Sequence, residues 1–231
     1  MSATALILCA GRGERLRPLT DRIPKPLLPV RGKPLVEWHL EALARAGVQE
    51  VVINTAWLEE QFPAALGNGG RWGLKIHWSM EGRAFGSALE TGGGIANALP
   101  LLADKFWVVS GDVFLPGFEF DPAAAQAFAQ GDELAHLWLV DNPPHHPAGD
   151  FALGDDGLVM SDGAPRLTWA SVGLFDAALF AGIAAGSSLR LRPLFDQAMQ
   201  LRRLRAQRWQ GVWIDVGTPA RWAAANVATP V

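Results

Sequence analysis

Short apolar runs alternate with segments of helical periodicity along the first half of the chain, and this alternation constrains the fold more than any other feature. Each apolar run is too short and too continuous for an amphipathic helix and is typical of a buried strand. Strands are expected at residues 5–10, 51–53, 74–78 and 106–109, and helices at 34–46, 58–66 and 95–102. Such short connections imply right-handed crossovers and a mostly parallel sheet that helices cover on both faces.

The second half of the chain has a different pattern, with more strands than helices. A length of 231 residues suits a single α/β domain. We therefore predict one domain over residues 1–231, whose central sheet carries a smaller mixed β extension beyond about residue 133. Strands are expected in it at 134–140, 149–153, 167–175 and 212–215, and helices at 176–185, at 191–201 and from Pro219.

Charge and cysteine content exclude several classes of partner. A net charge of −3 provides no broad cationic surface, so no nucleic-acid partner is expected. No apolar stretch approaches the roughly 20 residues that cross a bilayer as a helix, so no membrane span is expected. Cys9 is the single cysteine, and no charged leader precedes the first apolar run. We expect a cytoplasmic protein.

Two glycines and two cations follow the first strand. Gly11 and Gly13 could bring backbone N–H groups close to phosphate oxygens, although glycines after a strand by themselves often mark only a tight turn. A Walker loop and a dinucleotide fingerprint are both excluded, because no Gly-Lys-Ser/Thr run is present and Leu16 replaces a third glycine. Arg15 and Lys25, the latter between two prolines, add fixed positive charge suited to a triphosphate.

The whole run from Leu8 to Val30 resembles the signature of the sugar-phosphate nucleotidyltransferases. The matching pattern is L-C-A-G-x-G-x-R-L-x-P-L-T followed by P-K-P-L-L-P-V. The resemblance implies a Rossmann-like, GT-A-like fold, with a nucleotide-binding half over about 1–133 and a sugar-binding half over about 134–231. It also implies that the glycines wrap the triphosphate, that Arg15 steadies the departing pyrophosphate and that Lys25 bridges the reacting phosphates.

Two aspartates are candidate metal ligands. Asp112 follows Gly111 at the end of an apolar strand, where ligands bind at the edge of α/β sheets. Asp215 lies in the run W-I-D-V-G-T, which resembles a W-x-D-x-G-T element of the same family. We expect the two carboxylates to meet and to hold Mg²⁺ against the α-phosphate. The acceptor phosphate is already ionised, so the chemistry needs no catalytic base, and Cys9 and the histidines are expected to be bystanders.

Further matching runs lie at 54–58, at 90–94 (E-T-G-G-G), at 140–143 (V-D-N-P) with His145 and His146, at 149–151 (G-D-F) and around Asp215. Through them the chain is similar across nearly its whole length to the N-acetylmuramate α-1-phosphate uridylyltransferases of bacterial cell-wall recycling. This resemblance implies UTP as the nucleotide donor and N-acetylmuramic acid α-1-phosphate as the sugar acceptor. For His145 and His146 we favour a structured proline-rich turn over ligand contact. By position, Ala10, Glu81 and Thr91 would line the base and ribose pocket, and Gly149, Asp150 and Thr168 would hold the sugar.

Three departures from that pattern leave alternatives open. Cys9 replaces an alanine, Ser110 replaces an asparagine, and the loop at 83–88 is several residues longer than usual. Because this loop adjoins the nucleotide pocket, a hexose or heptose 1-phosphate guanylyltransferase is the first alternative. A catalytically silent subunit that only binds sugar nucleotides is the second. The presence of Arg15, Lys25 and both aspartates favours an enzyme over that subunit.

Overall fold

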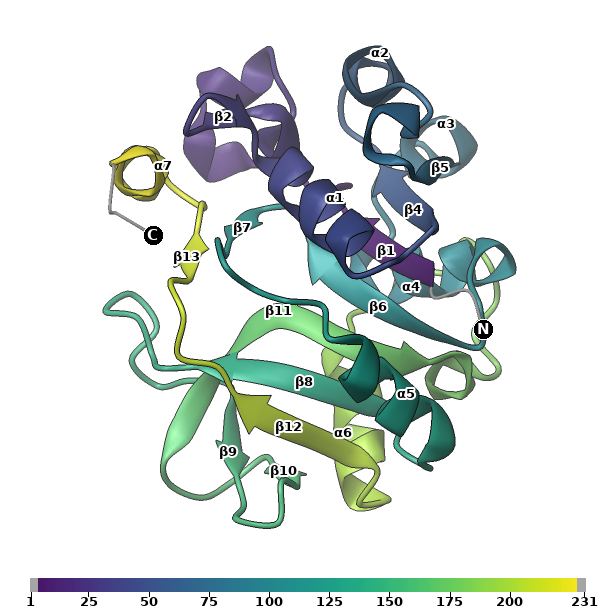
Figure 1. The fold of residues 1–231 in the computed structure, drawn as a ribbon, viewed down its shortest axis with the longest axis vertical. Coiled ribbons are helices and arrows are strands. Elements are labelled where there is room, and N and C mark those ends of the chain that lie inside the picture. The colour runs from purple at the N-terminus through teal and green to yellow at the C-terminus, as the bar shows by residue number, and fades with distance from the viewer. Residues whose placement is uncertain (1–3, 228–231) are drawn as a thin grey trace.

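A nine-stranded sheet forms the centre of the molecule in the computed structural model, which describes residues 4–227. Its main path runs in the order β10-β9-β11-β6-β1-β4-β5, and β8 and β12 extend it from β11 (Figure 1). The four strands expected from the first half are confirmed as its parallel core, because β1 pairs with β4 and β6, and β4 with β5. These strands are β1 (Thr4–Leu8), β4 (Glu50–Thr55), β5 (Lys75–Met80) and β6 (Lys105–Ser110).

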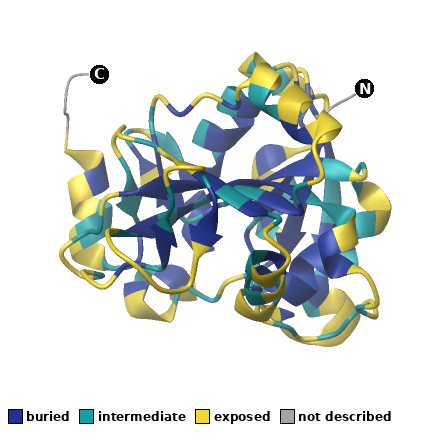
Figure 2. Ribbon diagram, turned by 90° about the horizontal axis from the view of Figure 1, so that it is seen from below, coloured by how far each residue is buried: buried dark blue, intermediate teal, exposed yellow. Residues whose placement is uncertain are grey.

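Helices cover both faces of this core, as predicted. Alternate side chains of β1 enter different clusters: Ala5 and Ile7 pack with α1, whereas Leu6 packs with α4 on the other face. Buried strands and exposed outer helix surfaces are seen together in Figure 2. The helices of this half are α1 (Leu35–Arg45), α2 (Gln61–Leu66), α3 (Glu81–Phe85), α4 (Glu90–Ala98) and α5 (Pro122–Gln130).

The mixed β extension is also confirmed, and it continues the same sheet. The long strand β11 pairs antiparallel with β6 on one side and with β8 and β9 on the other. β12 then adds to β8 in the parallel direction. The extension comprises β8 (Ala135–Val140), β9 (Phe151–Leu153), β10 (Val159–Met160), β11 (Arg166–Asp176) and β12 (Leu204–Arg208), with α6 (Arg192–Gln200) packed against it.

Short elements complete the fold next to the carboxyl edge of the parallel strands. The two-residue strand β13 pairs antiparallel with β7, and α7 follows it, capped by the Thr218 hydroxyl, which accepts from Arg221 N. No helix among residues 4–227 is long and apolar enough to span a membrane. These elements are β2 (Pro29–Val30), β3 (Lys33–Pro34), β7 (Val113–Phe114), β13 (Ile214–Asp215) and α7 (Pro219–Asn226).

Several expectations for secondary structure were wrong. The helix expected at 176–185 is only a 3₁₀ turn at Ala177–Phe180. The last strand expected at 212–215 is reduced to β13 and lies outside the main sheet, while the strand β12 and the helix α5 had not been predicted. The extended loop at 83–88 begins inside a helix, because α3 spans Glu81–Phe85 and ends at Gly86, which has a φ of 80°.

Candidate active site

The glycine-rich loop follows β1 and is folded into three consecutive 3₁₀ turns. Gly13 adopts a φ of +67°, and a Cβ there would lie 3.0 Å from Thr20 Cγ2 and 3.2 Å from Lys25 Cβ. The Thr20 hydroxyl donates to Gly13 O over 2.9 Å and closes the loop. A Cβ on Gly11 would meet nothing within 4 Å, so the backbone there borders open space. The loop is therefore preorganised around a concavity, as a phosphate site requires.

Arg12 fastens this loop to the segment that follows β4. Its guanidinium donates to Thr20 O at 2.8 Å and pairs with Asp21 at 2.6 Å. The same group lies 3.7 Å from the centre of the Trp57 ring, a cation–π distance. The Trp57 indole also donates to Thr20 O over 2.9 Å. Arg12 thus has its own partners, and Arg15 is left exposed beside the cavity.

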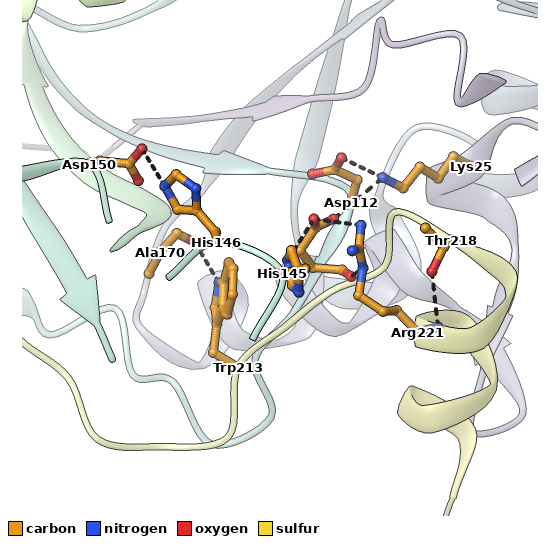
Figure 3. Close-up of polar contacts among 10 residues, drawn as sticks. Lys25, Asp112, His145, His146, Asp150, Ala170, Trp213, Thr218 and Arg221 are labelled. Carbon is orange, nitrogen blue, oxygen red and sulfur yellow. Dashed lines mark hydrogen bonds and ion pairs between the residues drawn. The ribbon is translucent and has the colours of Figure 1, made fainter. Parts of the chain in front are cut away.

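Lys25 brings the two predicted carboxylates together, and Figure 3 shows its ammonium beside Asp112. Its Nζ lies 2.6 Å from Asp112 Oδ2 and 3.9 Å from Asp215 Oδ1. Only 6% of Lys25 is exposed, so this ammonium is held by its surroundings rather than moving freely in solvent. The expectation that Asp112 and Asp215 meet in space is confirmed, because both carboxylates face one cation.

Asp112 follows directly from the end of β6, in the turn that ends at β7. Ser110 Oγ donates to its Oδ1 over 2.7 Å. Burial alone would raise the pKa of Asp112, but the Lys25 ammonium and the Ser110 hydroxyl outweigh burial and hold this pKa below its ordinary value. Gly111 makes the tight turn possible, since a Cβ there would lie 2.5 Å from Cys9 Sγ. Asp112 is consequently an oriented, ionised carboxylate.

Asp215 reaches the same place because β13 pairs with β7, which sets Asp215 opposite Val113. Val216 N also donates to Asp112 O over 3.0 Å. Arg221 forms two hydrogen bonds to Asp215: its Nε donates to the backbone oxygen of Asp215 at 2.8 Å, and its Nη2 donates to Oδ2 at 3.0 Å. Two segments that are about a hundred residues apart in the chain are therefore joined at this edge of the sheet.

Close packing explains why the W-I-D-V-G-T run has a glycine at position 217. A Cβ on it would lie 2.2 Å from Arg221 Nη2, 2.8 Å from Asp215 Oδ1 and 3.0 Å from Arg15 Nη2. The exposed Arg15 of the glycine loop thus comes close to Asp215. Any side chain at Gly217 would displace these three groups.

These residues surround a cavity of about 730 Å³, a volume suited to a small-molecule ligand. Its wall combines the glycine loop, the start of α4, the Asp112 turn and part of β11. Of the residues predicted for the site, those that line it are Ala10, Gly11, Gly13, Arg15, Lys25, Thr91 and Asp112. Glu81, Gly149, Asp150, Thr168 and Asp215 do not belong to its lining.

Glu81 lies behind the cavity wall and is fully buried. It accepts from Leu89 N at 2.8 Å and from Asn54 Nδ2 at 2.7 Å. Burial raises the pKa of Glu81. Asn54, whose Oδ1 accepts from Cys9 N at 2.9 Å, lines the cavity in front of it. Glu81 is thus positioned to orient Asn54, so its predicted contribution to the base pocket would be made through that amide.

The residues predicted to hold the sugar either belong to β11 or lie close to it. Asp150 Oδ2 accepts from Trp169 N at 2.9 Å, and its Oδ1 lies 3.0 Å from His146 Nε2. Thr168 Oγ1 donates to Asn142 Oδ1 over 2.9 Å. Gly149 has a φ of +62°, and a Cβ there would lie 2.7 Å from the same Asn142 oxygen. Direct sugar contact by Gly149, Asp150 and Thr168 stays a prediction.

Sequence reasoning assigned no role in the site to several residues at or beside it, among them Asn54, Trp169, Ser171 and Arg221. Arg221 had a local signal, because it lies in the first turn of a helix that begins directly after the W-I-D-V-G-T run. Asn54 begins a run at 54–58 that resembles the uridylyltransferases, whereas Trp169 and Ser171 occur within an apolar strand and carry no motif. His145, which was expected to belong to a turn, has its Nε2 at 3.6 Å from Asp215 Oδ2.

Comparison with known proteins agrees with this geometry. The family described as nucleotidyl transferase matches residues 4–161. N-acetylmuramate alpha-1-phosphate uridylyltransferase of Neisseria meningitidis serogroup B is 49% identical over 96% of both chains. The protein of that name from Caulobacter vibrioides is 30% identical and covers 96% of this chain and 95% of its own.

A solved structure from Bacillus anthracis, assigned as a glucose-1-phosphate thymidylyltransferase, has the same fold. It superposes with a TM-score of 0.83 at 19% identity and covers 97% of this chain and 94% of its own. The family match spans more than half of the chain, and the matches to both named relatives cover at least 95% of each chain. The chain therefore belongs to the nucleotidyl transferase family and is a nucleotidyltransferase that acts on a sugar 1-phosphate.

Proposed function

We propose that this enzyme transfers a uridylyl group from UTP to N-acetylmuramic acid α-1-phosphate in a Mg²⁺-dependent reaction. The products would be the UDP-sugar and pyrophosphate. The choice of donor and acceptor is supported by the two full-length relatives, whose names state this activity. The observation that carries the chemistry is the placement of Lys25 between Asp112 and Asp215 at the edge of the glycine loop.

The donor set fits a divalent cation. Two carboxylates converge on one positive group, and hard oxygen ligands of this kind are what Mg²⁺ prefers. No group of three or more His, Cys, Asp or Glu side chains within residues 4–227 is arranged to hold a metal ion. Mg²⁺ in proteins usually retains several waters and binds through one or two carboxylates and substrate phosphates. Asp112 and Asp215 match that description.

The protein's own residues would bind and orient the triphosphate. Backbone N–H groups around Gly11 and Gly13 would face its oxygens, with Arg15 and Lys25 neutralising their charge. Mg²⁺ held by Asp112 and Asp215 would supply further charge neutralisation at the α-phosphate. An oxygen of the acceptor phosphate attacks the α-phosphorus, the bond from that phosphorus to the bridging oxygen breaks, and pyrophosphate leaves with the bonding electrons.

No side chain has to act as the nucleophile in this reaction. The acceptor phosphate is ionised at neutral pH, so positioning and charge stabilisation are sufficient. Cys9 borders the cavity, but burial, together with the nearby Asp112 charge, raises the pKa of its thiol. Cys9 therefore stays protonated and inert.

A substrate panel tests the proposal. Four nucleoside triphosphates would be combined with N-acetylmuramic acid, N-acetylglucosamine, glucose and mannose 1-phosphates, and pyrophosphate release measured with Mg²⁺ and with EDTA. We expect UTP with N-acetylmuramic acid 1-phosphate to give the highest kcat/KM, and EDTA to abolish release. Asp112→Asn should lose activity, whereas Asp104→Asn, outside the cavity lining, should keep it.

The panel separates the alternatives. Preferred turnover of GTP with mannose 1-phosphate would replace the proposed substrates with those of a guanylyltransferase. Full activity in EDTA would contradict the role of the metal. If no pair gave pyrophosphate while UTP still bound with equal affinity to the wild type and to Asp112→Asn, the chain would be a silent binder.

A further inference from the structure

An arginine occupies the turn of the hairpin that β2 and β3 form, in a backbone conformation that arginine rarely adopts. Val30 pairs with Lys33, so the two central residues of the turn are Arg31 and Gly32. Their φ angles are +52° and +87°. A two-residue turn with both φ angles positive favours Asn-Gly, because a longer side chain at its first position costs free energy. Contacts elsewhere must compensate for the arginine at this position.

The side chain of Arg31 contacts the C-terminal end of α7. Its Nε donates to Ala225 O at 3.1 Å, and its Nη2 donates to Val227 O at 3.3 Å. The backbone N of Arg31 donates to Asn226 Oδ1 at 2.8 Å. The last carbonyls of a helix have no partner within the helix and carry partial negative charge, so a cation is stabilising there. Arg31 thus caps a helix that lies far away in the chain.

A third hydrophobic cluster joins α7 to the hairpin. Its buried members are Val30, Leu35, Phe114, Val216 and Ala225. Trp222 of α7 packs against this cluster, and its Nε1 donates to Pro29 O at 2.9 Å. The guanidinium of Arg31 also lies 4.9 Å from the centre of the Phe114 ring. α7 is therefore packed against the hairpin and β7.

The helix α7 connects Arg31 with Asp215. At its N-terminal end Thr218 caps the helix, and Arg221 donates to both the backbone oxygen and the Oδ2 of Asp215 (Figure 3). The helix has eight residues, which corresponds to a length of about 12 Å. A change in the tilt of α7 at its C-terminal end would therefore move the Asp215 carboxylate at the other end.

The hairpin also leads back to Lys25. Only five residues separate Lys25 from Arg31, and the prolines among them restrict the backbone. Lys25 Nζ lies 3.9 Å from Asp215 Oδ1, which is too far for a hydrogen bond, so this contact does not by itself fix their spacing. Arg31 joins the two segments that carry these charges.

We propose that Arg31 is a positioning residue of the transfer reaction: by capping α7 it sets the spacing between Asp215 and Lys25. The proposal rests on the proposed function for the part that Asp215 takes in holding Mg²⁺. Arg31 does not belong to the cavity lining, so its effect passes through α7. The glycine loop keeps its own closing hydrogen bond from Thr20 to Gly13 when the cap is lost.

Arg31→Asn separates the cap from the hairpin. Asn-Gly is the sequence that this turn favours, so the hairpin should persist while the guanidinium contacts to α7 are lost. With the substrate pair that the wild type turns over fastest, kcat should fall about tenfold and the Mg²⁺ concentration at half-maximal rate should rise about tenfold. The KM for the nucleotide at saturating Mg²⁺ should change less than about twofold, because the glycine loop is unaltered.

Arg202→Asn is the matched control. Arg202 also has a positive φ, of 56°, but its guanidinium pairs with Asp156 in the β extension. This variant should match the wild type in kcat and in its Mg²⁺ requirement. Hydrogen–deuterium exchange of the metal-free protein gives a readout that does not depend on activity. Peptides from residues 212–227 should exchange faster in Arg31→Asn than in the wild type, and those from residues 4–24 should not.

Asp215→Asn, assayed in parallel, distinguishes the two proposals. If Asp215→Asn is inactive while Arg31→Asn has wild-type kcat and Mg²⁺ requirement, only the role of Arg31 is overturned. Unchanged exchange of residues 212–227 in Arg31→Asn would overturn it too, as would a lower melting temperature with unaltered kinetics. Wild-type activity in Asp215→Asn would contradict the proposed function, and with it any effect of Arg31 through that carboxylate.

Discussion

Lys25 is the residue on which the charges of the site depend. It lies almost fully buried between Asp112 and Asp215, and it holds the pKa of Asp112 below its ordinary value against the effect of burial. The free protein thus keeps the Asp112 carboxylate ionised. A cation fixed here can also contact the phosphates when the substrates are bound.

Lys25→Met should lower kcat/KM for pyrophosphate release at least about 100-fold, because a fixed charge next to the reacting phosphates is lost. It should also reduce the melting temperature in EDTA, since the partly buried Asp112 carboxylate then loses the ammonium that lies 2.6 Å from it. Lys33→Met removes a different lysine that pairs with Glu41, and it should leave activity intact. Wild-type activity in Lys25→Met would contradict the proposed role.

His39 makes stability depend on pH through its burial. It is 2% exposed on α1, and its Nε2 has no hydrogen-bond partner among the described residues. Burial lowers its pKa from 6.5 to about 4, although a backbone hydrogen bond at Val113 and the Asp112 charge act in the opposite direction. The unfolded chain therefore binds a proton at this residue between these pH values, and the folded chain does not.

The free energy of unfolding should consequently fall as the pH drops from 6.5 towards 4, by up to about 3 kcal/mol from His39 alone. Urea titrations at pH 4.5, 5.5 and 7.5 would measure it. His39→Gln should flatten this pH dependence, whereas His77→Gln, at a residue on β5, should retain it. The same slope in His39→Gln and in the wild type would refute the assignment.

At the scale of elements, the turn between β13 and α7 decides the geometry of the site. It carries Asp215 and Gly217, and Arg221 reaches back to it from the first turn of α7. The space above the Gly217 Cα is filled by guanidinium and carboxylate groups. Only a hydrogen atom fits there, for reasons of packing and not of backbone conformation.

Gly217→Ala should fold but lose about 100-fold in kcat, because the new methyl group displaces Asp215 and Arg15 and misplacements of about 1 Å have effects of this size. Steady-state kinetics and circular dichroism test this together. Gly131→Ala is the matched control: its Cβ would meet nothing closer than 3.6 Å, so kcat should not change. Equal activity in the two variants would show that Arg15 and Asp215 need no precise placement.

The elements also differ in how well local sequence predicts them. The parallel strands and α1 were predicted because apolar periodicity encodes their burial directly. α5 was missed although Asp121 caps it by accepting from Ala123 N and Pro122 opens it. β12 was missed because only Leu204 and Ala206 face the core, between arginines at the sheet edge. β12 is stabilised by its backbone pairing with β8, and a local pattern of apolar residues does not encode such pairing.

At the scale of the whole molecule, one continuous sheet joins the two predicted halves. β11 lies between β6 of the first half and β8 of the second, and it is hydrogen-bonded to both (Figure 1). A hydrophobic cluster on each face likewise contains residues from before and after residue 133. If the halves separated, each would expose buried apolar side chains to water, which is unfavourable in free energy.

The protein should therefore unfold in one cooperative step. Urea transitions followed by far-ultraviolet circular dichroism and by tryptophan fluorescence should coincide. Residues 1–133 expressed alone should fail to give a cooperative transition, because β6 loses its neighbour β11. Two separated transitions in the full chain would instead show that the halves are independent folding units.

The sequence by itself determined the reaction class and the alternation of strands and helices. Both follow from local patterns: apolar periodicity, and a motif whose glycines and cations lie within one loop. Only the tertiary structure decided that Asp112 and Asp215 face the same lysine and that Glu81 accepts a hydrogen bond from Asn54. It also decided that a β-bulge containing Ser171 interrupts β11 between Trp169 and Gly173. The physical reason is that these features depend on pairing between strands that are far apart in the chain. They also depend on hydrogen bonds between groups that come within reach of each other only in the folded protein.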